Sequence, residues 1–298
     1  MPQYNEKCPF CPGKEKETPP ETFRLGDPNH WRVRVVYNKF AALSREGARI
    51  RKVNGSYRSM SGVGIHEVII EHPYHNAVTA LLAEEEVADI IRAYQNRYLS
   101  VQEDERIESI IIFKNHGPTA GTSLEHPHSQ VIATPIVPPQ VRTRNEQAIN
   151  YFDDTGRCIF CQTMEDELKA KERIIMETGH FVAFIPYAAL SPFHIWIFPR
   201  RHTSSFASIT GEEIKDLARN LKTTLAKLYY GLDNPDFNYS IRSTPMDERE
   251  TDYFHWYLSI VPRVSQTAGF EIGSGMYINI ALPEKSAEFL RHISTPNP

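Results

Sequence analysis

The sequence Asn115-His-Gly-Pro-Thr-Ala-Gly-Thr-Ser-Leu-Glu-His-Pro-His-Ser-Gln130 joins a loop of small residues to an alternating His-x-His-x-Gln segment. Later in the chain, His255-Trp-Tyr-Leu-Ser259 keeps the first histidine of that segment but has Tyr257 at the position of His128. Residues two apart on a β-strand share one face, so each segment predicts a strand that presents alternate side chains together. The pair of segments indicates that one structural unit occurs twice.

The same order of features surrounds each segment. Each half begins with a Cys-x-x-Cys pair, Cys8 with Cys11 and Cys158 with Cys161. Each then continues with a histidine, an amphipathic helix, a strand and a final histidine. We therefore predict two related halves, separated at the proline-rich residues 134–140 and delimited as residues 1–144 and 145–298.

One long helix is predicted in each half. Thr210 and Glu213 form a capping-box pattern, and the residues after them form an apolar stripe with helical spacing: Ile214, Leu217, Leu221, Leu225 and Leu228. In the first half, residues 84–99 carry a similar stripe of Val87, Ile91, Tyr94 and Tyr98. With one principal helix per half, the strands predict an α+β fold in which helices cover one side of an antiparallel sheet.

Composition excludes several classes of partner. The 298 residues carry a formal net charge of −4 with no long run of one sign, so the chain lacks the electrostatic footprint of a protein that binds nucleic acid or an anionic membrane. No apolar run approaches the roughly 20 residues of a membrane span, and the first residues do not resemble a signal peptide. We expect a soluble, cytoplasmic protein.

The cysteine pairs indicate two structural zinc sites. Two thiolates two residues apart can bind one ion, and zinc prefers four tetrahedral ligands from cysteine and histidine. The repeat supplies the remaining ligands, which gives the sets Cys8, Cys11, His75 and His126, and Cys158, Cys161, His180 and His255. Four protein ligands leave no open position, so these ions would be structural. His72 competes with His75, and free thiols or a redox pair are the alternative for the cysteines.

The loop and strand of residues 115–130 indicate phosphoryl chemistry. A neutral His128 can attack an α-phosphorus and form a phosphoramidate. Gly117, Gly121 and Ser123 allow backbone amides and a hydroxyl to approach phosphate oxygens. Gln130 can donate and accept hydrogen bonds but cannot act as a general acid, which favours transfer to a phosphate-type acceptor over hydrolysis.

Several motifs together resemble the galactose-1-phosphate uridylyltransferase (GalT) family of the histidine-triad superfamily, including its ADP-glucose phosphorylase branch. They are His-Pro-His-Ser-Gln at 126–130, the preceding Asn-x-Gly-x-x-x-Gly-x-Ser, the Cys-Pro-Phe-Cys start and the tail at 269–279. The resemblance implies a tandem repeat of two histidine-triad-like halves and a nucleotidylated His128. It also implies that the substrate is bound by Gln130, Ser123, Asn115, Asn38 and Phe40. A homodimer is implied as well, in which tail residues around Phe270 reach the neighbouring site.

The tail differs from that of well-studied uridylyltransferases at the positions that hold the hexose. It reads Gly269-Phe270 and Ser274-Gly275, which is closer to the ADP-glucose phosphorylase branch. We nevertheless rank uridylyl transfer from UDP-glucose to a hexose 1-phosphate, by a ping-pong mechanism, ahead of adenylyl transfer to phosphate of the ADP-glucose phosphorylase or adenylylsulfate type. Three less favoured functions are a non-catalytic zinc-stabilised nucleotide-binding module, a histidine-triad hydrolase and a catalytic-zinc hydrolase.

Overall fold

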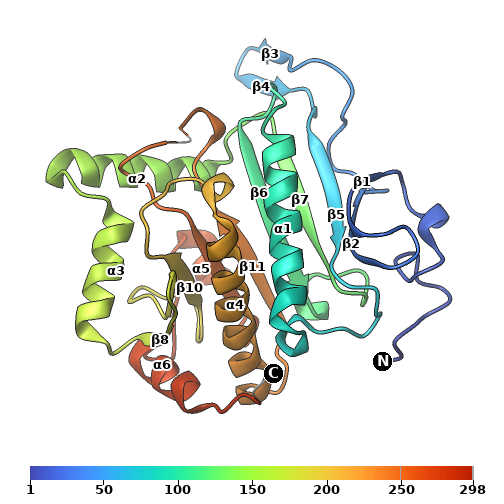
Figure 1. The fold of residues 1–298 in the computed structure, drawn as a ribbon. Coiled ribbons are helices and arrows are strands. Elements are labelled where there is room, and N and C mark those ends of the chain that lie inside the picture. Colours follow the sequence, from blue (N-terminus) through green and yellow to red (C-terminus); the bar gives the residue numbers. More distant parts are fainter. Residues whose placement is uncertain (249, 297–298) are drawn as a thin grey trace.

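The computed structural model describes residues 1–248 and 250–296, and one large antiparallel sheet organises them (Figure 1). Its strand order in the described chain is β1-β2-β5-β7-β6-β11-β12-β10-β9-β8. The strands are β1 (Glu21–Gly26), β2 (Trp31–Tyr37), β5 (Ile65–Ile70), β6 (Ser109–His116), β7 (His128–Thr134), β8 (Ile174–Glu177), β9 (Phe181–Phe184), β10 (Ile195–Pro199), β11 (Phe237–Arg242) and β12 (Tyr257–Pro262). A separate hairpin pairs β3 (Arg51–Asn54) with β4 (Tyr57–Met60).

The two halves meet at the middle of this sheet. Strands before residue 135 form one side, strands after residue 170 form the other, and β6 pairs with β11 between them. The pairing sets Asn115 opposite Asn238 and Lys114 opposite Tyr239. Both halves therefore share one continuous backbone hydrogen-bond network, and residues of the second half lie beside the 115–130 stretch.

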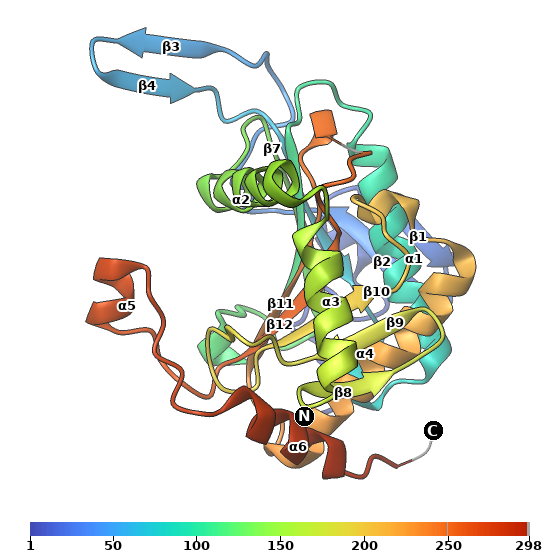
Figure 2. The same ribbon diagram turned by 90° about the vertical axis from the view of Figure 1, so that its left-hand side faces the viewer.

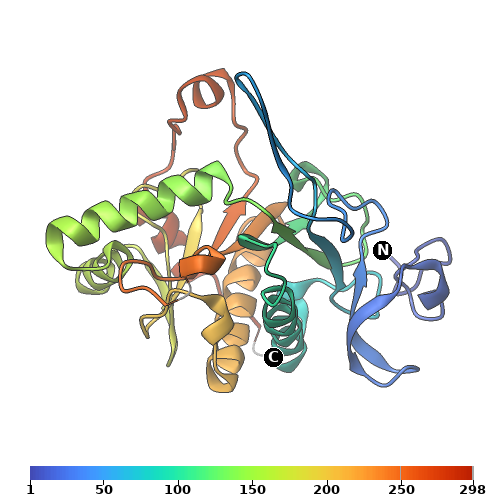
Figure 3. The same ribbon diagram turned by 90° about the horizontal axis from the view of Figure 1, so that it is seen from above.

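Two long helices cover one face of the sheet. They are α1 (Glu84–Val101) and α4 (Gly211–Gly231), which pack side by side in front of the strands in Figure 1 and appear end-on in Figure 3. The capping box at α4 forms as predicted: Thr210 Oγ1 accepts from the Glu213 N–H at 3.2 Å, and Glu213 Oε2 accepts from the Thr210 N–H at 2.8 Å. The predicted apolar stripes of both helices are buried in the main core. The α+β class and the covered antiparallel sheet are thus confirmed.

The remaining helices, which the sequence patterns did not reveal, are shorter or lie at the periphery. They are α2 (Pro139–Thr155), α3 (Ile159–Ala170), α5 (Gly269–Ser274) and α6 (Pro283–His292), with single 3₁₀ turns η1 (Glu15–Glu17), η2 (Thr79–Leu81), η3 (Pro118–Ala120), η4 (Phe206–Ser208) and η5 (Met246–Glu248). The predicted boundary after residue 144 falls inside α2 and stays a prediction. Among the described helices, none combines the length and apolar character that a membrane crossing requires.

The opposite face of the sheet carries two small apolar clusters, one in each half. In the first half, the N-terminal segment places Cys8, Phe10 and Cys11 against Trp31, Val36, Val68 and Ile70. In the second half, the start of α3 places Cys158 and Phe160 against Val182, Phe198 and Tyr257. Both Cys-x-x-Cys pairs therefore lie on the face that α1 and α4 leave uncovered.

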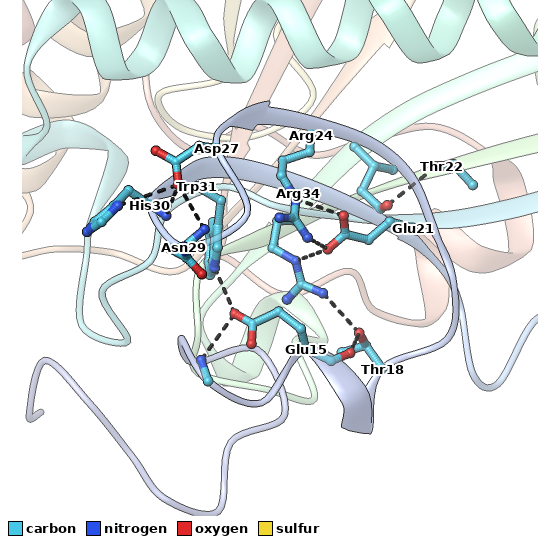
Figure 4. Close-up of polar contacts among 12 residues, drawn as sticks. Glu15, Thr18, Glu21, Thr22, Arg24, Asp27, Asn29, His30, Trp31 and Arg34 are labelled. Carbon is cyan, nitrogen blue, oxygen red and sulfur yellow. Dashed lines mark hydrogen bonds and ion pairs between the residues drawn. The ribbon is translucent and has the colours of Figure 1, made fainter.

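Polar contacts attach the N-terminal segment to strands β1 and β2 (Figure 4). The indole Nε1 of Trp31 donates to Glu15 Oε1 at 3.0 Å. The Arg34 guanidinium is fully buried, where it bonds Glu21 and donates to Thr18 Oγ1 at 3.1 Å. These contacts hold the segment that carries Cys8 and Cys11 in a fixed position over the sheet.

Two segments project away from the body on the side opposite α1 and α4. One is the β3–β4 hairpin and the other is the tail that carries α5 (Figures 2 and 3). Both present exposed apolar side chains: Val53 and Tyr57 on the hairpin, and Phe270, Ile272, Met276, Tyr277, Ile278 and Ile280 on the tail. Such surfaces mark sites of protein contact in folded proteins.

Candidate functional site

Strand β7 carries His128 and Gln130 on the uncovered face of the sheet. The odd-numbered residues Val131 and Ala133, which alternate with this face along the strand, belong to the main core under α1. The regular strand begins at His128 and not at His126 as predicted, because His126 and Pro127 precede its ladder with β5. His128 is 7% exposed and lies edge-on to the ring of Phe10, with a centroid distance of 5.8 Å.

The hydrogen bond of His128 determines which of its nitrogens can react. Nδ1 lies 2.8 Å from the backbone oxygen of His126, so Nδ1 carries the proton and donates to that carbonyl. Nε2 is then left with its lone pair. Burial lowers the pKa of His128 below its usual value, an effect to which the nearby Lys114 charge contributes. The ring is therefore neutral at pH 7 with Nε2 as its nucleophilic atom.

His128 lies where two pockets meet. The larger has a volume of about 450 Å³ and is lined by apolar side chains, including Phe10, Val36, Phe40 and Val68, and by Asn38 and Gln130. The smaller has a volume of about 260 Å³ and is lined mainly by the 115–127 stretch. His128, Ser123 and Leu124 line both. A molecule with an apolar ring system and a phosphate chain could therefore place its phosphate beside His128.

The glycine-bearing loop is held in place by the second half. Gly117 and Gly121 have φ angles of +84° and +86°, a backbone region that favours glycine. Asp236 accepts from both the backbone N–H and the hydroxyl of Thr119, at 2.6 Å and 2.5 Å. Asn238 Nδ2 donates to Asn115 Oδ1 and to the Ala120 backbone oxygen, each at 2.8 Å. The sequence did not indicate Asp236 or Asn238, because their role depends on the pairing of β6 with β11.

Asn38 and Gln130 are linked through His66. The Nε2 atom of His66 lies 2.8 Å from Gln130 Oε1 and 2.9 Å from Asn38 Nδ2. Phe40 follows Asn38 and is 85% exposed at the mouth of the larger pocket. Phe270, by contrast, lies on the projecting α5, half exposed, and lines neither pocket. Of the predicted substrate-binding residues, the structure gathers all but Phe270 around His128 or its loop.

A buried ion pair lies beneath the site. Lys114 Nζ bonds the Glu71 carboxylate, and both side chains are at most 2% exposed. Tyr94 donates to Glu71 Oε1 at 3.0 Å and contacts the Tyr239 hydroxyl at 2.5 Å. Burial acts to raise the pKa of Glu71, but Lys114 and these hydrogen bonds outweigh it, and the net direction is downward. The Glu71 carboxylate therefore remains ionised at pH 7.

The first predicted ligand set comes together beside His128. The ligand atoms of Cys8, Cys11, His75 and His126 all lie within 4.8 Å of one another. His126 Nε2 donates to the His72 backbone oxygen at 2.8 Å, which leaves Nδ1 unprotonated and directed at the two sulfurs. Burial lowers the pKa of His126 to about 4, so the ring is in its metal-binding form. These donors fit a tetrahedral zinc ion.

His72, the competing candidate, lies outside this cluster. Its Nε2 contacts Glu86 Oε1 at 3.1 Å, while its backbone oxygen accepts the bond from His126. His72 therefore supports the orientation of a ligand.

The second cluster differs from the prediction at one position. Cys158 and Cys161 are joined by His202, whose Nδ1 lies 3.1 Å from Cys161 Sγ. His255 Nδ1 lies 3.2 Å from the same sulfur. His202 Nε2 donates to the Thr251 backbone oxygen at 3.1 Å, which again leaves Nδ1 free for a metal. Cys158, Cys161 and His202 therefore offer three ligand atoms within 4.8 Å of one another, and His255, beside Cys161, is the candidate for the fourth ligand.

His180 does not belong to this second cluster, so its assignment is corrected to His202. The backbone N–H of His180 donates to Asp216 at 2.6 Å, and its side chain lies near the N-termini of α1 and α4. His180 precedes β9, the second strand from the edge of the sheet. His202 follows β10, which pairs with β12, the strand that begins two residues after His255.

Comparison with known proteins gives a consistent result. Two family models match: galactose-1-phosphate uridyl transferase, N-terminal domain, over residues 1–138, and its C-terminal domain over residues 144–293. An ADP-glucose phosphorylase from Arabidopsis thaliana is 41% identical over 293 residues, covering 96% of this chain and 82% of the relative. A galactose-1-phosphate uridylyltransferase from Thermotoga maritima is 26% identical over 295 residues, covering 96% of this chain and 89% of the relative.

A solved structure extends the comparison to the fold. An ADP-glucose phosphorylase from Arabidopsis thaliana with bound ADP-glucose superposes with a TM-score of 0.87 at 37% identity, covering 99% of this chain and 92% of that one.

Proposed function

The chain belongs to the galactose-1-phosphate uridylyltransferase family of nucleotidyltransferases, and on that premise we propose that it transfers an adenylyl group from ADP-glucose to phosphate through an adduct on His128. The observation that carries the proposal is the neutral His128, with Nε2 unprotonated, at the meeting point of two pockets. The proposal places ADP-glucose ahead of UDP-glucose as the donor, which reverses the order expected from the sequence.

Adenosine is favoured over uridine by the relatives. The sequence identity of this chain to the ADP-glucose phosphorylase is 41%, and its identity to the uridylyltransferase is 26% over a similar share of the chain. The tail residues Gly269, Ser274 and Gly275 also lack the side chains expected to hold the hexose of a hexose 1-phosphate acceptor. An acceptor as small as inorganic phosphate requires no such contacts.

Two displacements at phosphorus make up the reaction. In the first, the lone pair of His128 Nε2 forms a bond to the α-phosphorus of ADP-glucose, and the bond from that phosphorus to the bridging oxygen breaks. Glucose 1-phosphate leaves with the electron pair, so no proton donor is needed. In the second, a phosphate oxygen attacks the same phosphorus, the P–N bond breaks, and ADP forms while Nε2 regains its lone pair.

The surrounding residues have defined tasks in this proposal. The His126 carbonyl accepts a hydrogen bond from the His128 Nδ1–H throughout and stabilises the positive charge on the ring in the adduct. Gln130 and Ser123, with the backbone around Gly117 and Gly121, donate to phosphoryl oxygens. Asn38 and Phe40 bind the nucleoside in the larger pocket, and Asn115 lies at the phosphates.

Two structural zinc ions per chain complete the proposed enzyme. They would be bound by Cys8, Cys11, His75 and His126, and by Cys158, Cys161, His202 and His255. The first ion would hold His126, and with it the carbonyl that orients His128. Four reduced cysteines in such sites suit a reducing compartment, which supports a cytoplasmic location.

The proposed enzyme is a homodimer. This proposal is supported by the projecting tail, on which Phe270, Ile272, Met276, Tyr277, Ile278 and Ile280 together expose apolar side chains. Because Phe270 belongs to α5, which projects from the body (Figure 2), and lines neither pocket of its own chain, it is available to reach the site of a second copy.

One labelling experiment tests the proposal. The protein is incubated with ADP-glucose or UDP-glucose labelled at the α-phosphate, and protein-bound label that is stable to base and labile to acid is measured. We expect rapid labelling by ADP-glucose, slower labelling by UDP-glucose, discharge by phosphate to labelled ADP, and none of this with His128→Ala. Labelling of His128→Ala would exclude this nucleophile, and faster labelling by UDP-glucose would exclude the adenosine preference.

A further inference from the structure

We infer that His66 is a positioning residue that orients the amide of Gln130 toward the reacting phosphoryl group; this inference rests on the proposed function. His66 lies on β5, is 7% exposed, and sits two residues before Val68, which pairs with Gln130. Its ring lies between Gln130 on β7 and Asn38 after β2. His66 is not expected to touch the substrate.

A backbone N–H fixes the proton position on the ring. Ala42 N–H donates to His66 Nδ1 at 3.0 Å, so Nδ1 must carry a lone pair and the proton of the neutral ring is on Nε2. That Nε2–H can bond only to an acceptor, which is Gln130 Oε1 at 2.8 Å. Asn38 Nδ2 also lies 2.9 Å from this nitrogen, but a protonated Nε2 cannot accept from it.

The consequence concerns which end of the Gln130 amide faces the pocket. Because Oε1 of Gln130 accepts the hydrogen bond from His66, the NH₂ group of Gln130 is the end of the amide that faces the pocket. His128 lines the same pocket. An NH₂ group stabilises the negative charge on a phosphoryl oxygen, whereas a carbonyl oxygen in the same place repels it. A glutamine amide can turn over by itself, and His66 removes that freedom.

The second half of the chain has a histidine with similar contacts, His194, but no nucleophilic histidine beside it. Trp196 pairs with Ser259 as Val68 pairs with Gln130, so His194 corresponds to His66. Leu190 N–H donates to His194 Nδ1 at 3.2 Å, and His194 Nε2 lies 2.9 Å from Ser259 Oγ. Trp196 Nε1 lies 3.2 Å from that nitrogen, as Asn38 does in the first half. Since this half has Tyr257 in place of the nucleophile, His194 provides a matched control for a purely structural role.

Two substitutions separate the contacts of His66. In His66→Asn, the side-chain oxygen lies as many bonds from Cα as Nδ1 does, so it can still accept from Ala42, but no donor reaches Gln130. In His66→Gln, the amide nitrogen lies as many bonds from Cα as Nε2 does and can still donate to Gln130. The proposal predicts a defect in the first variant and its recovery in the second.

The experiment measures single-turnover adduct formation from α-labelled ADP-glucose over a range of concentrations, with thermal unfolding and zinc content as structural controls. We expect His66→Asn to lower the maximal rate about tenfold, the change that losing one neutral hydrogen bond corresponds to, with little change in the half-saturating concentration. His66→Gln should recover most of this rate. His194→Asn should unfold at a lower temperature and form the adduct at the wild-type rate.

Three results would overturn the inference while leaving the proposed function intact. They are a wild-type rate in His66→Asn, an equal defect in His66→Gln, and an equal defect in His194→Asn. Absence of any adduct in the wild-type protein would instead reject the proposed function, and the role of His66 with it.

Discussion

The Sγ atom of Cys161 lies 3.1 Å from Nδ1 of His202, a residue that lies shortly after β10 ends at Pro199. This contact predicts that His202→Ala reduces zinc from two ions per chain to one and costs at least several kcal/mol of stability, because a structural zinc contributes directly to folding. Metal analysis of the purified protein, with thermal unfolding, measures both effects. His180→Ala is the control and should retain two ions. The opposite pattern would restore His180 as the ligand.

The error at His180 shows what the sequence could not supply. In the first half the ligand His75 follows β5, and the strand that corresponds to β5 by its pairing with the motif strand is β10. The corresponding histidine is therefore the one after β10. Three histidines lie between Cys161 and His255, namely His180, His194 and His202, and strand pairing distinguishes the one that corresponds to His75.

Other parts of the fold and site were predictable because they depend on local patterns. The capping box at Thr210 and the stripes of α1 and α4 follow from helical periodicity, and alternation on β7 placed His128 and Gln130 together. The contributions of His66 and Asn238 were not predictable. Both act across strands that are distant in sequence, and no local pattern encodes those neighbours.

Gly117 and Gly121 should respond differently to the same substitution. A Cβ at Gly117 would lie 1.7 Å from Asp236 Oδ1, whereas at Gly121 its nearest neighbour is Asn115 Nδ2 at 4.0 Å. Gly121 lies in the αL region (φ 86°, ψ 23°), where an alanine costs roughly 1 kcal/mol of backbone strain. Gly117 (φ 84°, ψ 161°) lies in a region that is essentially restricted to glycine, so its backbone strain is larger. Only Gly117→Ala also displaces Asp236 from Thr119 and moves the loop.

We therefore expect adduct formation to fall at least tenfold in Gly117→Ala and by less than threefold in Gly121→Ala, as roughly 1 Å of misplacement is costly at a reacting centre. Rapid-quench labelling with ADP-glucose measures both. Equal defects would mean that the contact with Asp236 does not position the loop.

Stability should depend on pH through the pair of Glu71 and Lys114. The folded-state pKa of Glu71 is lowered, so its contribution is present above its unfolded value, near 4.3, and is lost as pH falls through the folded value. Glu71→Gln leaves Lys114 as an unpaired buried charge, at a cost of roughly 3–5 kcal/mol at pH 7.

Denaturant titration of the wild-type protein and of Glu71→Gln at pH 7, 5.5 and 4 measures their free energies of unfolding. The difference between the two free energies should narrow toward the lowest pH. Glu85→Gln is the control, because Glu85 is 69% exposed beside Arg92 and its loss should cost no more than about 1 kcal/mol. A difference that stays constant with pH would show that Glu71 is not charged in the folded protein.

The exposed tail predicts that each active site combines residues from two chains. If Phe270 reaches the partner's site, a heterodimer of a His128→Ala chain and a Phe270→Ala chain contains one site with both changes and one site with neither. Random reassociation of equal amounts then gives about one quarter of the wild-type sites, since half of the dimers are mixed and each has one intact site. If Phe270 acts within its own chain, every site carries one change and activity does not recover.

Adduct formation after subunit exchange decides between these outcomes. Light scattering establishes that dimers form, and each variant alone gives the baseline. Recovery requires a tail that crosses the interface, because neither chain supplies both residues by itself.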